Sequence, residues 1–208
     1  ESKLEDCLLS LGQLADGGGE IILLDGGSTD KTLEIARKFG VKVVKQRKGS
    51  YDTWRNQGKE VAKSEWLFYV DPDERVTTEL RKEILDVTSL RHPSPLVAYA
   101  IPRRNFVFGK ELKHGGWYPD YVLRLIKKDK LIRWEGELHE QPKIDGEVGH
   151  LKNPFIHLKE ENLSDMVGKT NKWSEIEAKL LLDSGHPKMA WWKFIRPVLT
   201  EVFDRLVL

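Results

Sequence analysis

The chain has 208 residues and a formal net charge of +1, because 34 Lys and Arg residues nearly balance 33 Asp and Glu residues. Hydrophobic residues make up 39% and charged residues 32% of the sequence, a composition that indicates one folded core and excludes a disordered chain. The balanced charge gives no reason to expect nucleic-acid binding. Cys7 is the only cysteine, which excludes an intrachain disulfide and indicates a reducing compartment.

Neither a basic-then-apolar leader nor an apolar run of roughly 20 residues occurs in the sequence, so we expect no signal peptide and no spanning helix. The first half of the chain alternates between apolar runs and helical periodicity. In chain order, it predicts a helix around 4–11, a strand at 21–24, a helix ending at Gly40, a strand at 41–44, a helix at 51–62, a strand at 66–70 and a helix at about 78–90. This alternation predicts a parallel sheet with right-handed crossovers.

The second half of the sequence has a different pattern of residues. After a predicted strand at about 97–102 we expect long loops rich in Gly, Trp and His, and helical periodicity returns at 163–182. The segment 189–208 carries apolar residues at helical spacing with basic flanks, a pattern that fits an amphipathic helix in a membrane interface. A terminal helix packed on its own domain or on another subunit is the alternative.

Two predicted strands end in carboxylates. Strand 21–24 runs into Asp25 and a glycine-rich turn, and strand 66–70 runs into Asp71 and Asp73. Open α/β sheets bind ligands at the carboxyl ends of their strands, so two acidic ends indicate a metal-assisted nucleotide site. The structural alternative is a tight turn and a helix cap at each place.

Five motifs occur together and in order. They are Asp25-Gly-Gly-Ser-Thr-Asp30, Asp71-Pro-Asp-Glu-Arg-Val76, Pro102-Arg-Arg-Asn105, His114-Gly-Gly-Trp-Tyr-Pro-Asp-Tyr-Val-Leu-Arg-Leu125 and Leu138-His-Glu140. The set resembles the glycosyltransferase family 2 enzymes of GT-A fold, and most closely the bacterial branch with the β-glucosyltransferases of lipopolysaccharide core assembly.

The resemblance implies a Rossmann-like, mostly parallel sheet flanked by helices, with a C-terminal amphipathic helical extension. We expect a GT-A-like domain at 1–160, with a nucleotide-binding half at about 1–92 and an acceptor-side half at about 93–160. A helical region at 161–208 follows. The family normally opens with a strand that precedes the position of Glu1, so we expect part of the base pocket to lie outside this sequence.

Roles for individual residues follow from the resemblance. It implies nucleotide contacts from Asp25, Gly27, Ser28, Arg55, Asn56 and Asp71. The family's Asp-x-Asp motif implies that Asp71 and Asp73 hold Mg²⁺ or Mn²⁺ against the diphosphate, and His139 is a further candidate ligand. These hard cations take oxygen ligands, and the metal would stabilise the leaving group. Lys48 is a weaker candidate on the intervening loop.

Inverting sugar transfer needs one general base to take the proton of the acceptor hydroxyl. Asp120, ahead of a Tyr-Val-Leu-Arg-Leu segment, matches the family pattern, and Glu137 and Glu140 are alternatives. Pro119-Asp120 could instead cap the next element. His114, Trp117 and Tyr118 form a predicted acceptor-side loop whose aromatic rings would stack on a sugar.

We therefore expect a metal-dependent, inverting transferase that moves a sugar from a nucleotide diphosphate, with UDP as the expected nucleotide, onto a glycan or lipid-linked acceptor at the cytoplasmic membrane face. A non-catalytic nucleotide-sugar-binding protein and a sugar nucleotidyltransferase are the alternatives. A dinucleotide dehydrogenase is disfavoured, because the cluster at 17–19 precedes its strand and no Gly-x-Gly-x-x-Gly follows one.

Overall fold

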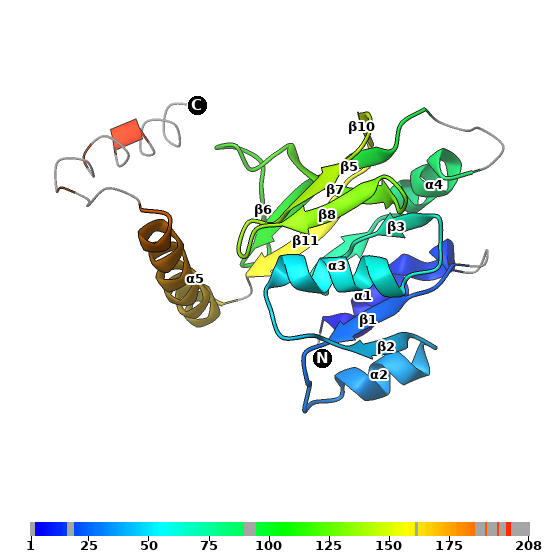
Figure 1. Cartoon of the computed structure of the whole chain (residues 1–208), viewed down its shortest axis with the longest axis horizontal. Helices are drawn as coiled ribbons and strands as arrows, with labels where there is room; N and C mark the ends of the chain where they lie inside the picture. The colour runs from blue at the N-terminus through cyan, green and yellow to red at the C-terminus, as the bar shows by residue number, and fades with distance from the viewer. Residues whose placement is uncertain are drawn as a thin grey trace. The chain divides into compact units, whose positions relative to one another are not determined.

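The structure, a computed structural model, describes residues 3–15, 19–89, 95–160 and 162–185, together with four isolated residues between 190 and 200. The chain forms two compact units, 1–103 with 121–157 and 104–120 with 158–208. The mixture of helices and strands in Figure 1 confirms the predicted α/β class. Almost all of the predicted interfacial helix at 189–208 lies outside the described residues.

The elements of the first half follow the predicted order. They are α1 (Leu4–Leu11), a 3-10 turn (Gly12–Leu14), β1 (Ile22–Asp25), α2 (Thr32–Lys38), β2 (Lys42–Lys45), α3 (Tyr51–Val61), β3 (Trp66–Phe68), β4 (Glu74–Val76) and α4 (Thr78–Val87). β1 and β2 pair in parallel, as the alternation predicts. β3 pairs antiparallel with β7 (Asp120–Lys127), a strand from the second half.

The prediction of long loops after residue 102 is wrong, because this part of the chain forms further strands. They are β5 (Ala98–Val107), β6 (Lys110–Leu112), β7, β8 (Leu131–Glu135), β9 (Gln141–Ile144), β10 (Val148–His150) and β11 (Phe155–Glu160), and α5 (Leu163–Asp183) follows. β5 and β6 are joined by Phe108 and Gly109, both with positive φ, as a two-residue hairpin turn requires. Phe-Gly is not a usual signal for that turn, so the hairpin escapes sequence analysis.

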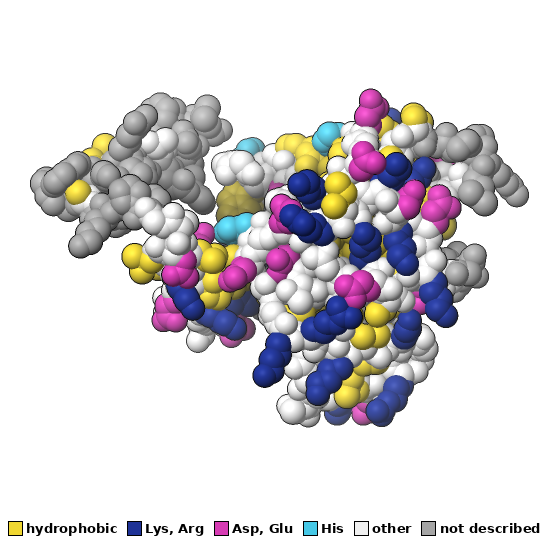
Figure 2. Space-filling view, in the orientation of Figure 1, with side chains coloured by type: hydrophobic (Ala, Val, Ile, Leu, Met, Phe, Trp, Pro, Cys, Tyr) yellow, Lys and Arg dark blue, Asp and Glu magenta, His cyan; other side chains and the backbone are white. Residues whose placement is uncertain are grey.

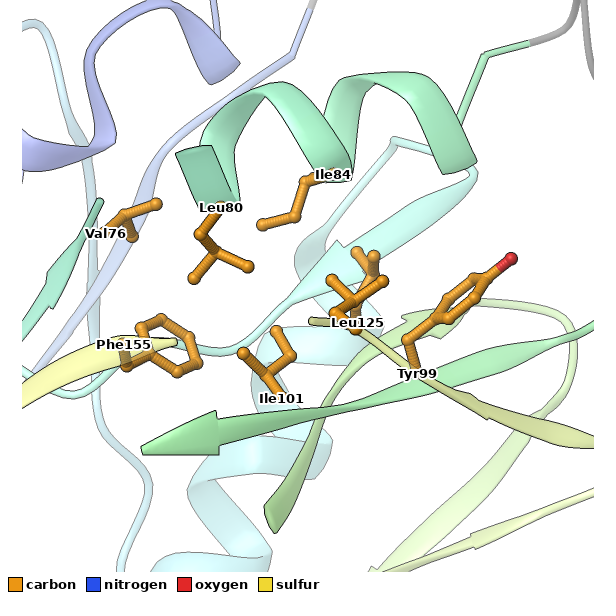
Figure 3. Close-up of a cluster of buried hydrophobic side chains, with 8 residues drawn as sticks. Val76, Leu80, Ile84, Tyr99, Ile101, Leu125 and Phe155 are labelled. Atoms are coloured by element: carbon orange, nitrogen blue, oxygen red, sulfur yellow. The ribbon is translucent and has the colours of Figure 1, made fainter. Parts of the chain in front are cut away.

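The larger sheet has the order β3-β7-β5-β11-β4, and β6 and β10 also pair with β5. Successive residues of a strand point to opposite faces, and Leu125 and Ile126 of β7 accordingly enter different clusters. Leu80 and Ile84 of α4 cover the face that carries Leu125 (Figure 3). Trp134 of β8 packs on the other face, so buried contacts fix the carboxyl end of β3 from both sides.

A third cluster joins the helices near the chain's start to the small sheet. Leu4 and Leu8 of α1 pack with Ala36 of α2 and Val41, next to partly buried Leu23 of β1. Figure 2 shows Lys and Arg interspersed with Asp and Glu on the visible face, as a net charge near zero leads one to expect. Within the described part of the chain, no helix is long and apolar enough to cross a membrane.

Candidate functional site

The segment after β3 folds into a tight turn that holds two carboxyl groups. The N–H of Glu74 donates to the carbonyl of Asp71 at 2.9 Å, and the N–H of Asp71 donates to Glu74 Oε2 at 2.9 Å. Pro72 takes the second turn position, where its fixed φ suits the bend. The turn therefore presents Asp71 and Asp73 at the end of the strand, as predicted.

Two guanidinium groups hold the Asp71 carboxylate. Arg55 Nη2 of α3 lies 3.2 Å from Oδ1, and Arg124 Nη2 of β7 lies 2.5 Å from Oδ2. Burial disfavours the charged form of Asp71, but Arg124 and Arg55 outweigh it and hold its pKa below the ordinary value. Asp71 is therefore ionised at neutral pH, with both oxygens engaged.

Each arginine is itself anchored. Arg55 Nε donates to Glu140 Oε1 at 2.7 Å, and its guanidinium lies 4.9 Å from the ring centroid of Trp134. Arg124 Nη2 also lies 3.6 Å from Oε1 of Glu74, a side chain with no exposed surface. Burial raises the pKa of Glu74, and Arg124 opposes this shift.

Asp73 has a different neighbour. Its Oδ2 lies 3.7 Å from Nε2 of His157, which β11 brings opposite Glu74. A carboxylate and an imidazole together suit a divalent cation whose remaining ligands come from a diphosphate. Among the described residues, no three His, Cys, Asp or Glu side chains are grouped to hold a metal by themselves. Ligand roles for Asp71, Asp73 and His139 remain predictions, and the His139 side chain is exposed.

The Asp25 side chain stabilises the turn that follows β1. Its carboxylate accepts hydrogen bonds from the N–H groups of Gly27 at 3.0 Å and Ser28 at 3.1 Å. Hydrogen bonding from the Ser28 side chain, and then from these backbone groups, lowers the pKa of Asp25 in spite of burial. Gly27 has a φ of 101°, which disfavours any side chain there. These contacts match the tight-turn alternative, and the nucleotide roles of Asp25, Gly27 and Ser28 remain predictions.

Asn56 ties α3 to β8. Its Nδ2 donates to the carbonyl of Trp134 at 2.9 Å, and its Oδ1 accepts the N–H of Trp134 at 2.8 Å. The reciprocal pair gives Asn56 a structural function, and its predicted contact with a nucleotide remains untested. Lys48 lies exposed on the loop before α3.

The three candidate bases lie in different surroundings. Asp120, the first residue of β7, accepts a hydrogen bond at 3.0 Å from Nδ2 of Asn105, which is 1% exposed. Glu137 is exposed in the turn after β8. Glu140 Oε1 lies 2.7 Å from Arg55 Nε, so this carboxylate is already engaged in an ion pair.

The predicted acceptor-side residues also differ in exposure. His114 and Tyr118 are exposed, and Trp117 is partly buried with Lys159 Nζ 4.7 Å from its ring centroid. The carbonyl of Trp117 accepts from Asn105 Nδ2 at 3.2 Å, so the same amide joins this loop to Asp120. Their role toward a sugar remains a prediction.

Arg124, Glu74 and His157 belong to the cluster, but sequence reasoning did not assign them roles. Arg124 interrupts the apolar Leu123 and Leu125 in a strand, and a buried arginine in that setting needs a carboxylate partner. The sequence alone therefore indicates that Arg124 pairs with a carboxylate. Nothing in the sequence indicates that His157 reaches Asp73, because the pairing of β11 with β4 creates that contact.

A cavity of about 870 Å³ adjoins this cluster between β1 and β3, with side chains of α1 and α3 in its walls. Its lining is largely apolar, through residues such as Leu8, Leu23 and Leu67. Arg55 and Asp71 also line it, so the cavity extends from β1 and β3 to the charged groups at the end of β3.

Comparison with known proteins gives a consistent assignment. A family model described as Glycosyl transferase family 2 matches residues 1–140. The lipopolysaccharide core biosynthesis glycosyltransferase LpsC of Rhizobium meliloti (strain 1021) is 26% identical over 198 residues, which cover 89% of this chain and 69% of that protein. An uncharacterized glycosyltransferase of Rickettsia bellii (strain RML369-C) is 24% identical over 99% of this chain and 76% of that protein.

Among solved structures, S. aureus TarS 1-349 is similar at 16% identity and a TM-score of 0.40, over 72% of this chain. This chain spans 54% of the length of that structure. The family model alone covers about two thirds of the sequence, including both acidic turns. The chain belongs to glycosyltransferase family 2, as the resemblance of its five motifs predicts.

Proposed function

We propose that the chain transfers a sugar, with inversion, from a nucleotide diphosphate donor, UDP in the first instance, to an acceptor hydroxyl. The observation that carries the proposal is the placement of the Asp71-Pro-Asp-Glu74 turn at the end of β3, where Arg55 and Arg124 reach its first carboxylate. The guanidinium of Arg55 beside the strand end suits a diphosphate, and carboxylates suit ribose hydroxyls or a metal.

The proposed donor site includes Mg²⁺ or Mn²⁺, held by Asp73 with His157 beside it. When bound, the cation would neutralise charge on the departing nucleoside diphosphate. Asp73 is better suited than Asp71 to this task, because both oxygens of Asp71 are within reach of arginines. Arg55 sits on the cavity side of the cluster and would orient the diphosphate.

For the general base we propose Asp120. Its hydrogen bond from buried Asn105 holds the carboxylate in place, and a carboxylate can take the proton of an acceptor hydroxyl. The acceptor would contact His114, Trp117 and Tyr118, which belong to the same compact unit as Asp120.

The acceptor is proposed to be a glycan or a lipid-linked sugar of the cell envelope, by analogy with LpsC, a lipopolysaccharide core biosynthesis glycosyltransferase. Such an acceptor lies at the cytoplasmic face of the membrane in this proposal, and segment 189–208 would bring the enzyme to it.

The test is a thermal-shift screen of nucleotide sugars and free nucleotides, each with and without Mn²⁺. A ligand at about 100 times its dissociation constant adds roughly 2.7 kcal/mol of stability. Donors that stabilise the protein are then incubated with cell-envelope glycans, and products are analysed by mass spectrometry. Release of UDP with a glycosylated product supports the proposal. Binding without turnover favours a binding protein, and pyrophosphate release favours a nucleotidyltransferase.

A further inference from the structure

Arg124 is the most deeply placed cation of the cluster. It lies on β7 between Leu123 and Leu125 and is 6% exposed. β7 is the hydrogen-bonded neighbour of β3, and the N–H of Tyr69 donates to the Arg124 carbonyl at 2.9 Å. The backbone ladder therefore sets the position of Arg124 beside the end of β3, where the acidic turn begins.

One nitrogen of Arg124 serves two carboxylates. Nη2 lies 2.5 Å from Asp71 Oδ2 and 3.6 Å from Glu74 Oε1. Glu74 has no exposed side-chain surface, and its Oε1 has no hydrogen-bond partner among the described residues. A buried carboxylate that lacks a hydrogen bond relies on nearby positive charge, so Glu74 attracts the guanidinium of Arg124.

Asp71 is less constrained by itself. Its side chain is 39% exposed, and the exposed turn would let a carboxylate sample several rotamers. Glu74 fixes its backbone through the Asp71 N–H, and Arg124 fixes its carboxylate. Both contacts depend on Glu74, which accepts the Asp71 N–H directly and attracts Arg124. The buried Arg124–Glu74 pair therefore fixes the position of the Asp71 side chain.

We propose that Arg124 and Glu74 form a positioning pair that aligns the Asp71 carboxylate for the donor nucleotide. This inference rests on the proposed function. Arg124 is assigned to act through Asp71, because its Nη2 is directed to the two carboxylates of the turn, whereas Arg55 and Asp71 also line the cavity. Arginine suits this role better than lysine, because its guanidinium is more weakly hydrated than an ammonium and is therefore favoured in buried ion pairs.

The test measures UDP affinity with Mn²⁺ present, together with the melting temperature, for four proteins. They are the parental chain, Arg124→Lys, the double variant Arg124→Met/Glu74→Gln, and the control Arg103→Met. The double variant removes both buried charges, a change that preserves stability in many proteins. Arg103 Nη1 also approaches Glu74 Oε1, at 3.9 Å, so Arg103→Met controls for loss of a cation near Glu74.

We expect the double variant to melt within a few degrees of the parental chain and to bind UDP at least 10-fold more weakly. Arg124→Lys should fall between them, and Arg103→Met should bind within about twofold of the parental chain. Parental affinity in a folded double variant overturns the inference. If the double variant does not fold, parental affinity in Arg124→Lys overturns it instead. Absence of UDP binding by the parental chain overturns the proposed donor, and the inference with it.

Discussion

Asp73 Oδ2 lies 3.7 Å from Nε2 of His157, a contact made across paired strands β4 and β11. The two side chains are 27% and 14% exposed, so both remain partly open to solvent. Two arginines already hold Asp71, and Asp73 is therefore the carboxylate of the motif best placed to bind a cation, with His157 beside it.

We predict that Asp73→Ala abolishes the effect of Mn²⁺ on UDP affinity and leaves the fold intact. The carboxylate is partly exposed in a turn whose hydrogen bonds come from Asp71 and Glu74 instead. Isothermal titration with and without Mn²⁺ measures the effect. Asp129→Ala, in an exposed turn after β7, is the control and should behave as the parental chain. An undiminished effect of Mn²⁺ in Asp73→Ala would remove Asp73 from the site.

Asp120→Asn should slow sugar transfer by about 100-fold to 10,000-fold, the usual contribution of a general base. The amide can still accept the hydrogen bond of Asn105, so donor affinity should be nearly unchanged. Single-turnover transfer at saturating donor, with UDP affinity measured alongside, separates the two effects.

Glu137→Gln is the comparison for that experiment, and it should have a much milder effect. A parental rate in Asp120→Asn with an inactive Glu137→Gln would transfer the role of base to Glu137. Lost UDP binding in Asp120→Asn would instead make Asp120 a structural residue.

Asn56→Ala should destabilise the fold by about 1–3 kcal/mol, the cost of leaving buried backbone groups without partners. Both lost hydrogen bonds go to the backbone of Trp134, which is 3% exposed. Urea unfolding measures the change. Asn56→Asp keeps the acceptor for the Trp134 N–H but places a carboxylate oxygen against the Trp134 carbonyl, so it should also lose stability. Full stability with impaired UDP binding in Asn56→Ala would restore the nucleotide role predicted from the sequence.

Cys7 should resist thiol reagents in the native protein. Burial raises its pKa from 9.0 to about 12, and the residue is 4% exposed. A folded-state pKa raised by this amount lowers the thiolate fraction near pH 8 by about 1,000-fold. Because Cys7 is the only cysteine, reaction with a chromogenic disulfide reports on it alone. Equal rates with and without urea would show that α1 opens readily.

Segment 189–208 should drive association with anionic bilayers, because its sequence combines an apolar stripe with basic flanks. Liposome co-sedimentation of the full chain and of a chain ending at residue 188 tests this. Phosphatidylglycerol vesicles should retain the full chain much better than the truncated one, and phosphatidylcholine vesicles provide the neutral control. Equal sedimentation would assign the segment to packing or to a subunit contact.

Local sequence rules determined most of the first half of the chain. Apolar runs and helical periodicity located α1, β1, α2, β2, α3, β3 and α4, because each element is specified by residues close together in the sequence. The same rules placed carboxylates at the ends of β1 and β3, where the structure has them. The order of motifs was sufficient to identify the family.

The tertiary structure decided the rest, because it depends on which distant strands become neighbours. After residue 102 the strand β6 has only three residues, and β7 and β11 pair with strands far along the chain, so periodicity did not reveal these strands. Antiparallel pairing of β3 with β7 brings Arg124 to Asp71, and pairing of β4 with β11 brings His157 to Asp73. A sequence can show that a carboxylate ends a strand, but the charge that holds it comes from a neighbouring strand, and only the folded sheet selects that neighbour.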